Sequence, residues 1–239
     1  ISQIEPPKKD LPEIKNKKNT RAKYRNKQPK TIIADPVKGD PVDAVTGEVL
    51  LDQQDFTIPG RIPIAWERHY SSQNPRTGAT GRGWESFADI RLELNDQGEV
   101  VFYNGTAAPF HFEKLPHLKA VREPIDGGLL HKEEQHYTVR LKEGLTYYFP
   151  IPAGAWSEIP VEAIQDPAGN TLRFLRDQNG LREIREAGTD RSLKLASKNG
   201  RIEKIYLVRG YYDPLLLVQY EYDQNNNLIT VFDGLKNPY

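Results

Sequence analysis

The chain has 239 residues, and its 33 basic and 33 acidic side chains give a formal net charge of zero. It has no cysteine, which excludes disulfides, thiolate metal sites and cysteine nucleophiles, and no run of about 20 apolar residues that could span a membrane as a helix. The charge is unevenly divided, because residues 1–30 hold ten basic and three acidic side chains and carry +7, which leaves −7 on the rest. A basic segment joined to an acidic body is typical of an interaction tail.

Residues 1–37 are predicted to form an extended basic arm or linker. They are rich in Lys, Asn and Pro, so they bury too little apolar surface to offset the entropy of ordering. Nucleic acid is not expected as a partner, since Tyr24 is the one aromatic residue of the arm, and a membrane surface would require a more apolar amphipathic helix. The alternatives left open are a solvated linker and an arm attracted to its own acidic body.

From Asp40 onward the sequence predicts an all-β body built of antiparallel hairpins. Residues 90–103 and 138–149 each contain an alternating apolar and polar run, a turn with a glycine (Gly98, Gly144) and a second apolar run. Alternation is the period of a half-buried strand, and glycine accepts the positive φ of a tight turn.

From residue 166 onward the hairpins become a degenerate repeat. Copies begin at Asp166, Asp177, Ser197 and Asp223. The turn tips at Gly180, Gly200 and Asn226 lie 20 and 26 residues apart, and the longer step contains an apparent insertion near 209–214. Units of this length bury their faces only by stacking on neighbours. We expect the repeats of 166–239 to be truncated, because the last seven residues look like the middle of a further copy.

These repeats resemble the tyrosine–aspartate (YD) repeats of Rhs proteins, with Tyr222-Asp223 as the signature pair. The sequence upstream resembles the entry region of the Rhs shell in three ordered motifs, within 39–48, 55–72 and 81–84. The residues that carry the resemblance are Gly39, Asp40, Pro41, Asp43, Thr46, Gly47, Pro59, Gly60, Trp66, Arg68, Tyr70, Gly81, Gly83, Trp84, Gly180, Gly200, Tyr222 and Asp223. The resemblance covers residues 38–239, with 38–165 as the shell-entry domain.

The resemblance implies a structural function. Rhs hairpins wind into a large hollow β-barrel, or cocoon, that encloses a C-terminal toxin used in competition between bacteria. This chain would then be the N-terminal segment of such a shell, in a secreted effector made in the bacterial cytoplasm. Its expected partners are the remaining repeats, the enclosed toxin, and a secretion spike or tip protein of the type VI kind. The self-cleavage site of such proteins is expected outside this segment.

Several local patterns offer chemistry instead. Asp40, Asp43 and Glu48 suggest a carboxylate cluster, but no partner histidine lies at a useful spacing, and turn formation by Asp40 and Thr46 explains them better. The glycines of 78–83 lack the spacing and the strand–helix context of a phosphate loop, and we predict a turn pinned by a buried Trp84.

The histidines do not suggest a zinc site. His131 and His136 are five residues apart, which places them on opposite faces of a strand, and zinc enzymes use three converging ligands. No Gly-x-Ser-x-Gly elbow is present, so a hydrolase is disfavoured. We therefore expect no catalytic, cofactor or metal residue. The main alternative is a cell-surface adhesion or carbohydrate-binding β-repeat module, which would need an exposed platform at Trp66, Trp84 or Trp156.

Overall fold

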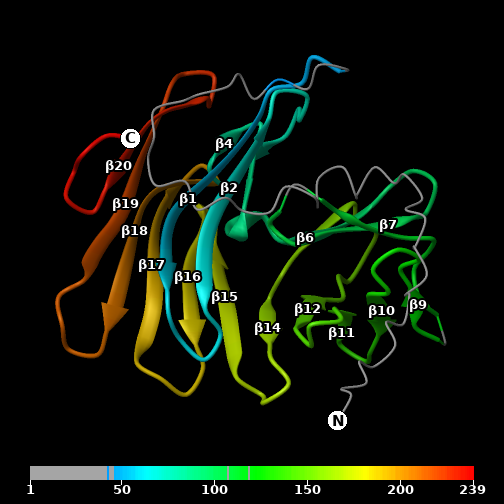
Figure 1. Cartoon of the computed structure of the whole chain (residues 1–239). Helices are drawn as coiled ribbons and strands as arrows, with labels where there is room; N and C mark the ends of the chain where they lie inside the picture. The colour runs from blue at the N-terminus through cyan, green and yellow to red at the C-terminus, as the bar shows by residue number, and fades with distance from the viewer. Residues whose placement is uncertain (1–41, 43–45, 107, 118) are drawn as a thin grey trace, which may run out of the picture. The chain divides into compact units, whose positions relative to one another are not determined.

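The computed structural model describes residues 42, 46–106, 108–117 and 119–239. Regular structure in these residues consists of antiparallel β-strands and one 3-10 turn, η1 (Phe87–Asp89), so the predicted all-β fold is confirmed (Figure 1). No helix in this part of the chain has the length and apolar character to cross a membrane. The predicted arm (1–37) and the motif residues Gly39, Asp40, Pro41 and Asp43 lie outside the described residues.

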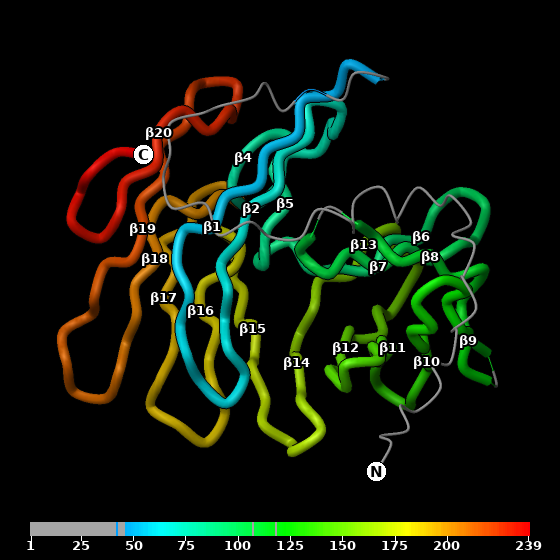
Figure 2. The backbone as a smooth tube through the Cα atoms, viewed as in Figure 1, coloured from blue at the N-terminus to red at the C-terminus, as the bar shows by residue number. Residues whose placement is uncertain are grey.

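The largest sheet has eleven strands, most of them paired with their neighbours in sequence. From one edge to the other, the strands are β9 (Val121–Arg122), β10 (Leu129–Lys132), β11 (His136–Arg140), β12 (Thr146–Pro150), β14 (Ala163–Gln165), β15 (Thr171–Asp177), β16 (Gly180–Glu186), β17 (Arg191–Lys198), β18 (Arg201–Arg209), β19 (Leu215–Tyr222) and β20 (Leu228–Asp233). The backbone reverses direction at each turn from β14 to β20 (Figure 2). The domain boundary predicted at 165/166 stays a prediction. The large sheet continues across this point, because β14 pairs with β15.

Three smaller sheets complete the described fold. The first contains β1 (Leu50–Ile58), β2 (Ile64–Ser71) and β5 (Trp84–Ser86); the second contains β6 (Arg91–Leu94), β7 (Val100–Tyr103), β8 (Phe110–Phe112) and β13 (Glu158–Pro160); the third contains β3 (Thr77–Gly78) and β4 (Gly81–Arg82). The two predicted hairpins are confirmed, because β6 pairs with β7 and β11 pairs with β12.

The β1–β2 hairpin packs on one face of the repeat strands. Near its tip, Ile58 and Ile64 line a small cavity together with apolar residues of four consecutive strands of the large sheet, namely Leu172, Ile184, Leu193 and Leu207. All six of these side chains are at most 9% exposed. Alternation in the repeat strands sends these apolar residues to one face, which the hairpin covers, and the core lies between the two layers.

Each of the last three hairpins has a register shift close to its turn. The shifts fall between Leu175 and Arg176, between Ala196 and Ser197, and between Glu221 and Tyr222, each opposite an extra residue on the returning strand. An extra residue of this kind is a β-bulge, which bends a strand and increases its twist. Each of the three bulges lies at the turn end of its hairpin. The three hairpins are therefore expected to bend at the same distance from their turns.

Three turns share a hydrogen-bonded structure that begins at an aspartate and ends at an asparagine four residues later. These pairs are Asp166 and Asn170, Asp223 and Asn227, and Asp233 and Asn237. Each carboxylate accepts bonds of 2.8–3.0 Å from the backbone N–H groups two and four residues later and from the asparagine side chain. These bonds, with the asparagine side chain first among them, lower the pKa of each aspartate.

Candidate functional site

Asp55 is the centre of a buried polar cluster that joins the β1–β2 hairpin to the last repeat, and we call it the Asp55 junction. Arg68 on β2 donates to both carboxylate oxygens, from Nε to Oδ2 at 2.6 Å and from Nη2 to Oδ1 at 2.7 Å. The hydroxyl of Tyr220 on β19 donates to Oδ2, and that of Tyr239 donates to Oδ1 at 3.0 Å. Trp66 closes the cluster, since its indole Nε1 donates to the Tyr220 oxygen at 3.0 Å.

The Asp55 junction contains one ion pair, between Asp55 and Arg68, that is excluded from solvent. The side chains of Asp55 and Arg68 are 0% and 2% exposed. Burial alone would lower the pKa of Arg68, but the hydrogen bonds and charge of Asp55 outweigh it and raise that pKa. Burial and the adjacent carboxylate raise the pKa of Tyr220 well above its usual value, so this phenol stays a neutral donor. The Arg68 guanidinium also lies 4.6 Å from the ring centroid of Trp84.

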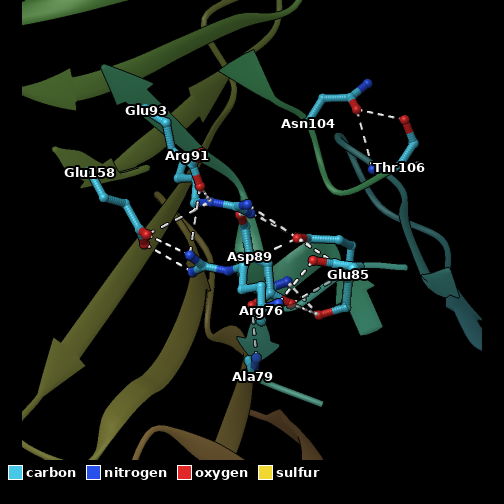
Figure 3. A network of polar contacts seen from close by, with 12 residues as sticks. Arg76, Ala79, Glu85, Asp89, Arg91, Glu93, Asn104, Thr106 and Glu158 are labelled. Atoms are coloured by element: carbon cyan, nitrogen blue, oxygen red, sulfur yellow. Dashed lines mark hydrogen bonds and ion pairs between the residues drawn. The ribbon is translucent and has the colours of Figure 1, made fainter. Parts of the chain in front are cut away.

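A second polar cluster, the Arg91 junction, connects the β3–β5 region to the four-stranded sheet (Figure 3). Arg91 on β6 donates to Glu85 of β5 at 2.7 Å and to Glu93 at 2.6 Å. Arg76 donates twice to Glu158 of β13, at 2.5 and 2.9 Å. Here two guanidiniums share three carboxylates, and Glu158 and Glu93 are 37% and 30% exposed. Arg91 is a polar residue of the alternating run 90–95, yet its side chain is only 2% exposed, because its guanidinium is paired with Glu85 and Glu93.

Asp89 fixes the turn beneath the Arg91 junction. Its Oδ2 accepts from the backbone N–H and the hydroxyl of Ser86 at 3.0 and 2.6 Å, and its Oδ1 accepts from the N–H of Ala79 at 2.7 Å. Burial and the nearby Asp89 charge raise the pKa of Glu85, although Arg91 opposes them. All of these carboxylates are occupied by protein donors, so the cluster holds elements together and presents no free acid or base.

Pro59 and Gly60 form the tip of the β1–β2 hairpin and rest on the arginine that opens β17. Arg191 donates to the carbonyl of Pro59, and its Nη2 lies 2.6 Å from Oε2 of Glu186. The other oxygen of Glu186, Oε1, accepts from the backbone N–H of Arg61 at 3.3 Å. A Cβ at position 60 would lie only 1.7 Å from the Arg191 guanidinium. A side chain at position 60 would therefore displace the Arg191 guanidinium from its place against the hairpin tip.

The glycine-containing loop at 78–83 lies on the turn tips of the repeats. The N–H of Arg82 donates to the carbonyl of Asn226 at 2.9 Å, and the N–H of Ile202 donates to the carbonyl of Ala79 at 2.8 Å. Gly81 has a φ of 112°, and a Cβ there would lie 3.1 Å from the Asn226 carbonyl oxygen. These contacts to two repeat tips give the loop a packing function, in keeping with the turn that we predicted.

Gly83, Tyr70 and Trp84 lie together beside this loop. Gly83 has a φ of 81°, and a Cβ there would lie 2.6 Å from the ring of Tyr70. The rings of Tyr70 and Trp84 are 5.2 Å apart. The prediction of a buried Trp84 is wrong in degree, because the side chain is only partly buried; Trp66 is the fully buried indole, at 0% exposure.

The repeat residues singled out from the sequence lie at the turn tips. The hydroxyl of Tyr222 donates to the carbonyl of Ile202 at 2.5 Å, and Asp223 forms one of the three aspartate–asparagine turns. Gly180 and Gly200 have φ of 113° and 80°, and a Cβ on Gly180 would lie 3.2 Å from the Cα of Gly200. Consecutive tips are therefore in close contact.

The described end of the first motif is a turn. The N–H of Glu48 donates to the hydroxyl of Thr46 at 3.3 Å, as in a threonine turn, and Gly47 has a φ of 68°. The described residues contain no group of three or more His, Asp or Glu side chains placed to hold a metal ion.

The sequence does not identify the two residues at the centre of the Asp55 junction as site residues. Asp55 opens the 55–72 motif without being among the residues that carry the resemblance, and the signature pair contains Tyr222, not Tyr220. A usable signal was present, because Tyr220 precedes Tyr222 by two and therefore points to the same face of β19.

Comparison with known proteins gives one family match and several relatives. Residues 39–112 match the family described as Domain of unknown function (DUF6531). The double-stranded DNA deaminase toxin A of Burkholderia cenocepacia (strain H111) is 30% identical over 207 residues, which is 82% of this chain and 14% of that protein.

Two proteins of Dickeya dadantii (strain 3937) carry the Rhs name. The probable deoxyribonucleases RhsB and RhsA are each 26% identical to this chain and align with 80% of it. The aligned parts are 14% and 13% of those proteins. The chain therefore spans about one seventh of the length of the curated relatives it matches.

Proposed function

The chain is an Rhs-family protein, and we propose that this part of it is the N-terminal structural segment of a shell enclosing a C-terminal toxin. The relatives named for toxin or nuclease activity align with this chain over a small fraction of their length. We infer that such an activity belongs to another part of the polypeptide, and we assign no catalytic residue here. The toxin would act between bacteria after secretion, on a spike or tip protein of type VI secretion.

The single observation that carries the proposal is the bent, continuous sheet. Eleven strands pair in one sheet, and the last three hairpins have bulges at the same level. Repeated bending in one place is what a curved wall requires, since a sheet without bulges curves less.

The β1–β2 hairpin supports the same function by covering the apolar face of the first repeats. The Asp55 junction, the Pro59–Gly60 tip and the 78–83 loop fasten it to β16, β17, β18 and β19 and to the β19–β20 turn. In such a wall, the β1–β2 hairpin would cover the apolar face of the first repeat strands and keep it from solvent. The role of the basic arm (1–37) as a linker or a docking segment stays a prediction.

The adhesion or carbohydrate-binding alternative is not favoured. Trp66 is fully buried, and Trp84 and Trp156 are partly buried. The ring of Trp156 packs 5.9 Å from that of Tyr137. None of the three indoles offers the exposed flat platform on which a sugar ring stacks.

Limited proteolysis of the full-length protein containing this chain tests the proposal. We expect its C-terminal region to be cleaved at least about tenfold more slowly than the same region produced alone, as for a segment reached only through opening of a folded wall. The Asp55→Ala variant should remove much of this protection, whereas the control Asp96→Asn, at an exposed turn residue, should retain it. Equal cleavage rates for the enclosed and the isolated C-terminal region would refute the shell function.

A further inference from the structure

The regular ladder between successive hairpins stops short of the turn tips, and at the tips themselves one backbone bond of 3.0 Å runs from the N–H of Gly200 to the carbonyl of Asn179. Between β16 and β17 the ladder ends at the pair Glu183 and Lys194, and between β18 and β19 it ends at the pair Lys204 and Gln219. Leu181 and Ile202 lie beyond these points and are 5% and 0% exposed. A buried carbonyl without a ladder partner is costly unless another donor reaches it.

A side chain of the following hairpin supplies that donor in each case. The hydroxyl of Ser197 donates to the carbonyl of Leu181 at 2.6 Å. The hydroxyl of Tyr222 donates to the carbonyl of Ile202 at 2.5 Å.

The first repeat hairpin makes the same kind of bond to the strand region before it. Nη1 of Arg176 donates to the carbonyl of Val161 at 2.5 Å, and Val161 is fully buried. The pairing of β14 with β15 begins only at Ala163 and Arg173, so Val161 also lies beyond the end of a ladder.

The three donors occupy one structural position. Within its own hairpin, each donor is paired with the first inward-facing residue after the turn: Arg176 with Leu181, Ser197 with Ile202, and Tyr222 with Leu228. Each donor also follows directly after the register shift of its hairpin. The residue paired with the donor of one hairpin is thus the acceptor for the donor of the next hairpin. Leu181, which pairs with Arg176, accepts from Ser197, and Ile202, which pairs with Ser197, accepts from Tyr222.

We propose that this position is an inter-hairpin tie, in which a side-chain donor replaces the missing end of the backbone ladder and fixes each hairpin to the one before it. The tyrosine of the Tyr222-Asp223 pair is then a positioning residue for the preceding hairpin, while the aspartate shapes its own turn. Arginine, serine and tyrosine share only the ability to donate to a carbonyl, which explains why such different residues occupy one position. The proposal rests on the hairpin repeats and not on toxin enclosure, so protection of a C-terminal toxin can fail while the ties hold.

Hydrogen exchange of backbone amides in the whole chain tests the ties. Ser197→Ala should speed exchange in β16 and β17 near the turn tips by about five- to tenfold, the effect of one lost hydrogen bond. Ser197→Thr keeps the hydroxyl and should exchange much as the wild type does. Tyr222→Phe should act in the same way on the tip ends of β18 and β19.

The matched control is Tyr211→Phe, since Tyr211 is fully exposed at the β18–β19 turn. It should leave exchange unchanged throughout β16–β19. The ties would be refuted if Tyr222→Phe and Ser197→Ala exchanged no faster than this control, or if Ser197→Thr exchanged as fast as Ser197→Ala. Global unfolding does not confuse the result, because it would raise exchange in β6 and β7 as well.

Discussion

The Asp55 junction and the Arg91 junction fasten elements of the same entry region with different numbers of charges. Asp55 and Arg68 form one sealed ion pair, completed by neutral tyrosine hydroxyls from residues more than 160 positions away. In the Arg91 junction, two guanidiniums share three carboxylates, all from within residues 76–158, and part of the cluster meets solvent. In the Asp55 junction the Arg68 guanidinium has one carboxylate partner, so loss of that carboxylate leaves the charge unpaired. In the Arg91 junction a second carboxylate remains when one is lost.

Removal of the single carboxylate should have the largest effect. Asp55→Ala leaves the Arg68 guanidinium buried without a counter-charge and should lower the free energy of unfolding by about 3–5 kcal/mol, measured by urea denaturation. The control Asp96→Asn, at an exposed turn residue, should change it by less than about 0.5 kcal/mol. A loss of unfolding free energy below about 1 kcal/mol in Asp55→Ala would mean that water reaches the ion pair, as it does at a surface salt bridge.

The redundant junction should tolerate a comparable deletion better. Glu85→Ala should lower the free energy of unfolding by about 1–3 kcal/mol, because Arg91 keeps its 2.6 Å bond to Glu93. The same denaturation series measures it, and the double variant with Glu93→Ala should lose more than the sum of the two single losses. A loss in Glu85→Ala as large as that of Asp55→Ala would remove the distinction between the junctions.

The smallest effect is expected at a carboxylate on the repeat strands, and it depends on pH. Burial would raise the pKa of Glu183, but hydrogen bonds from Arg185 and Lys194 outweigh it and lower the pKa to about 2. Because the folded-state pKa lies below the usual 4.5, the stabilisation is complete above that value and is lost as the pH falls toward 2. Glu183→Gln should therefore be less stable than the wild type at neutral pH.

The difference between these two proteins should shrink as the pH is lowered through this range, measured as the urea midpoint of each. Glu85 gives the opposite sign, since its raised pKa means that protonation is easier in the folded protein. A constant difference between Glu183→Gln and the wild type from neutral pH to pH 2 would contradict the assignment.

The local parts of the fold were predictable and the distant contacts were not. Alternation in 90–103 predicted the β6–β7 hairpin, because a half-buried strand shows its period in the sequence. The bulges were not predicted, because one extra residue looks the same as any other in a short alternating run. Asp55 and Tyr220 are 165 positions apart, and no local pattern states that they meet.

The aspartate–asparagine turns have a consequence for how such a chain changes over time. Each turn satisfies the carboxylate of its first residue with donors from the same five residues. Duplication or loss of one hairpin in the gene would therefore leave no unpaired carboxylate at the neighbouring turns. A sheet that contains such turns can therefore gain or lose one hairpin at a time without leaving a buried or unpaired carboxylate behind.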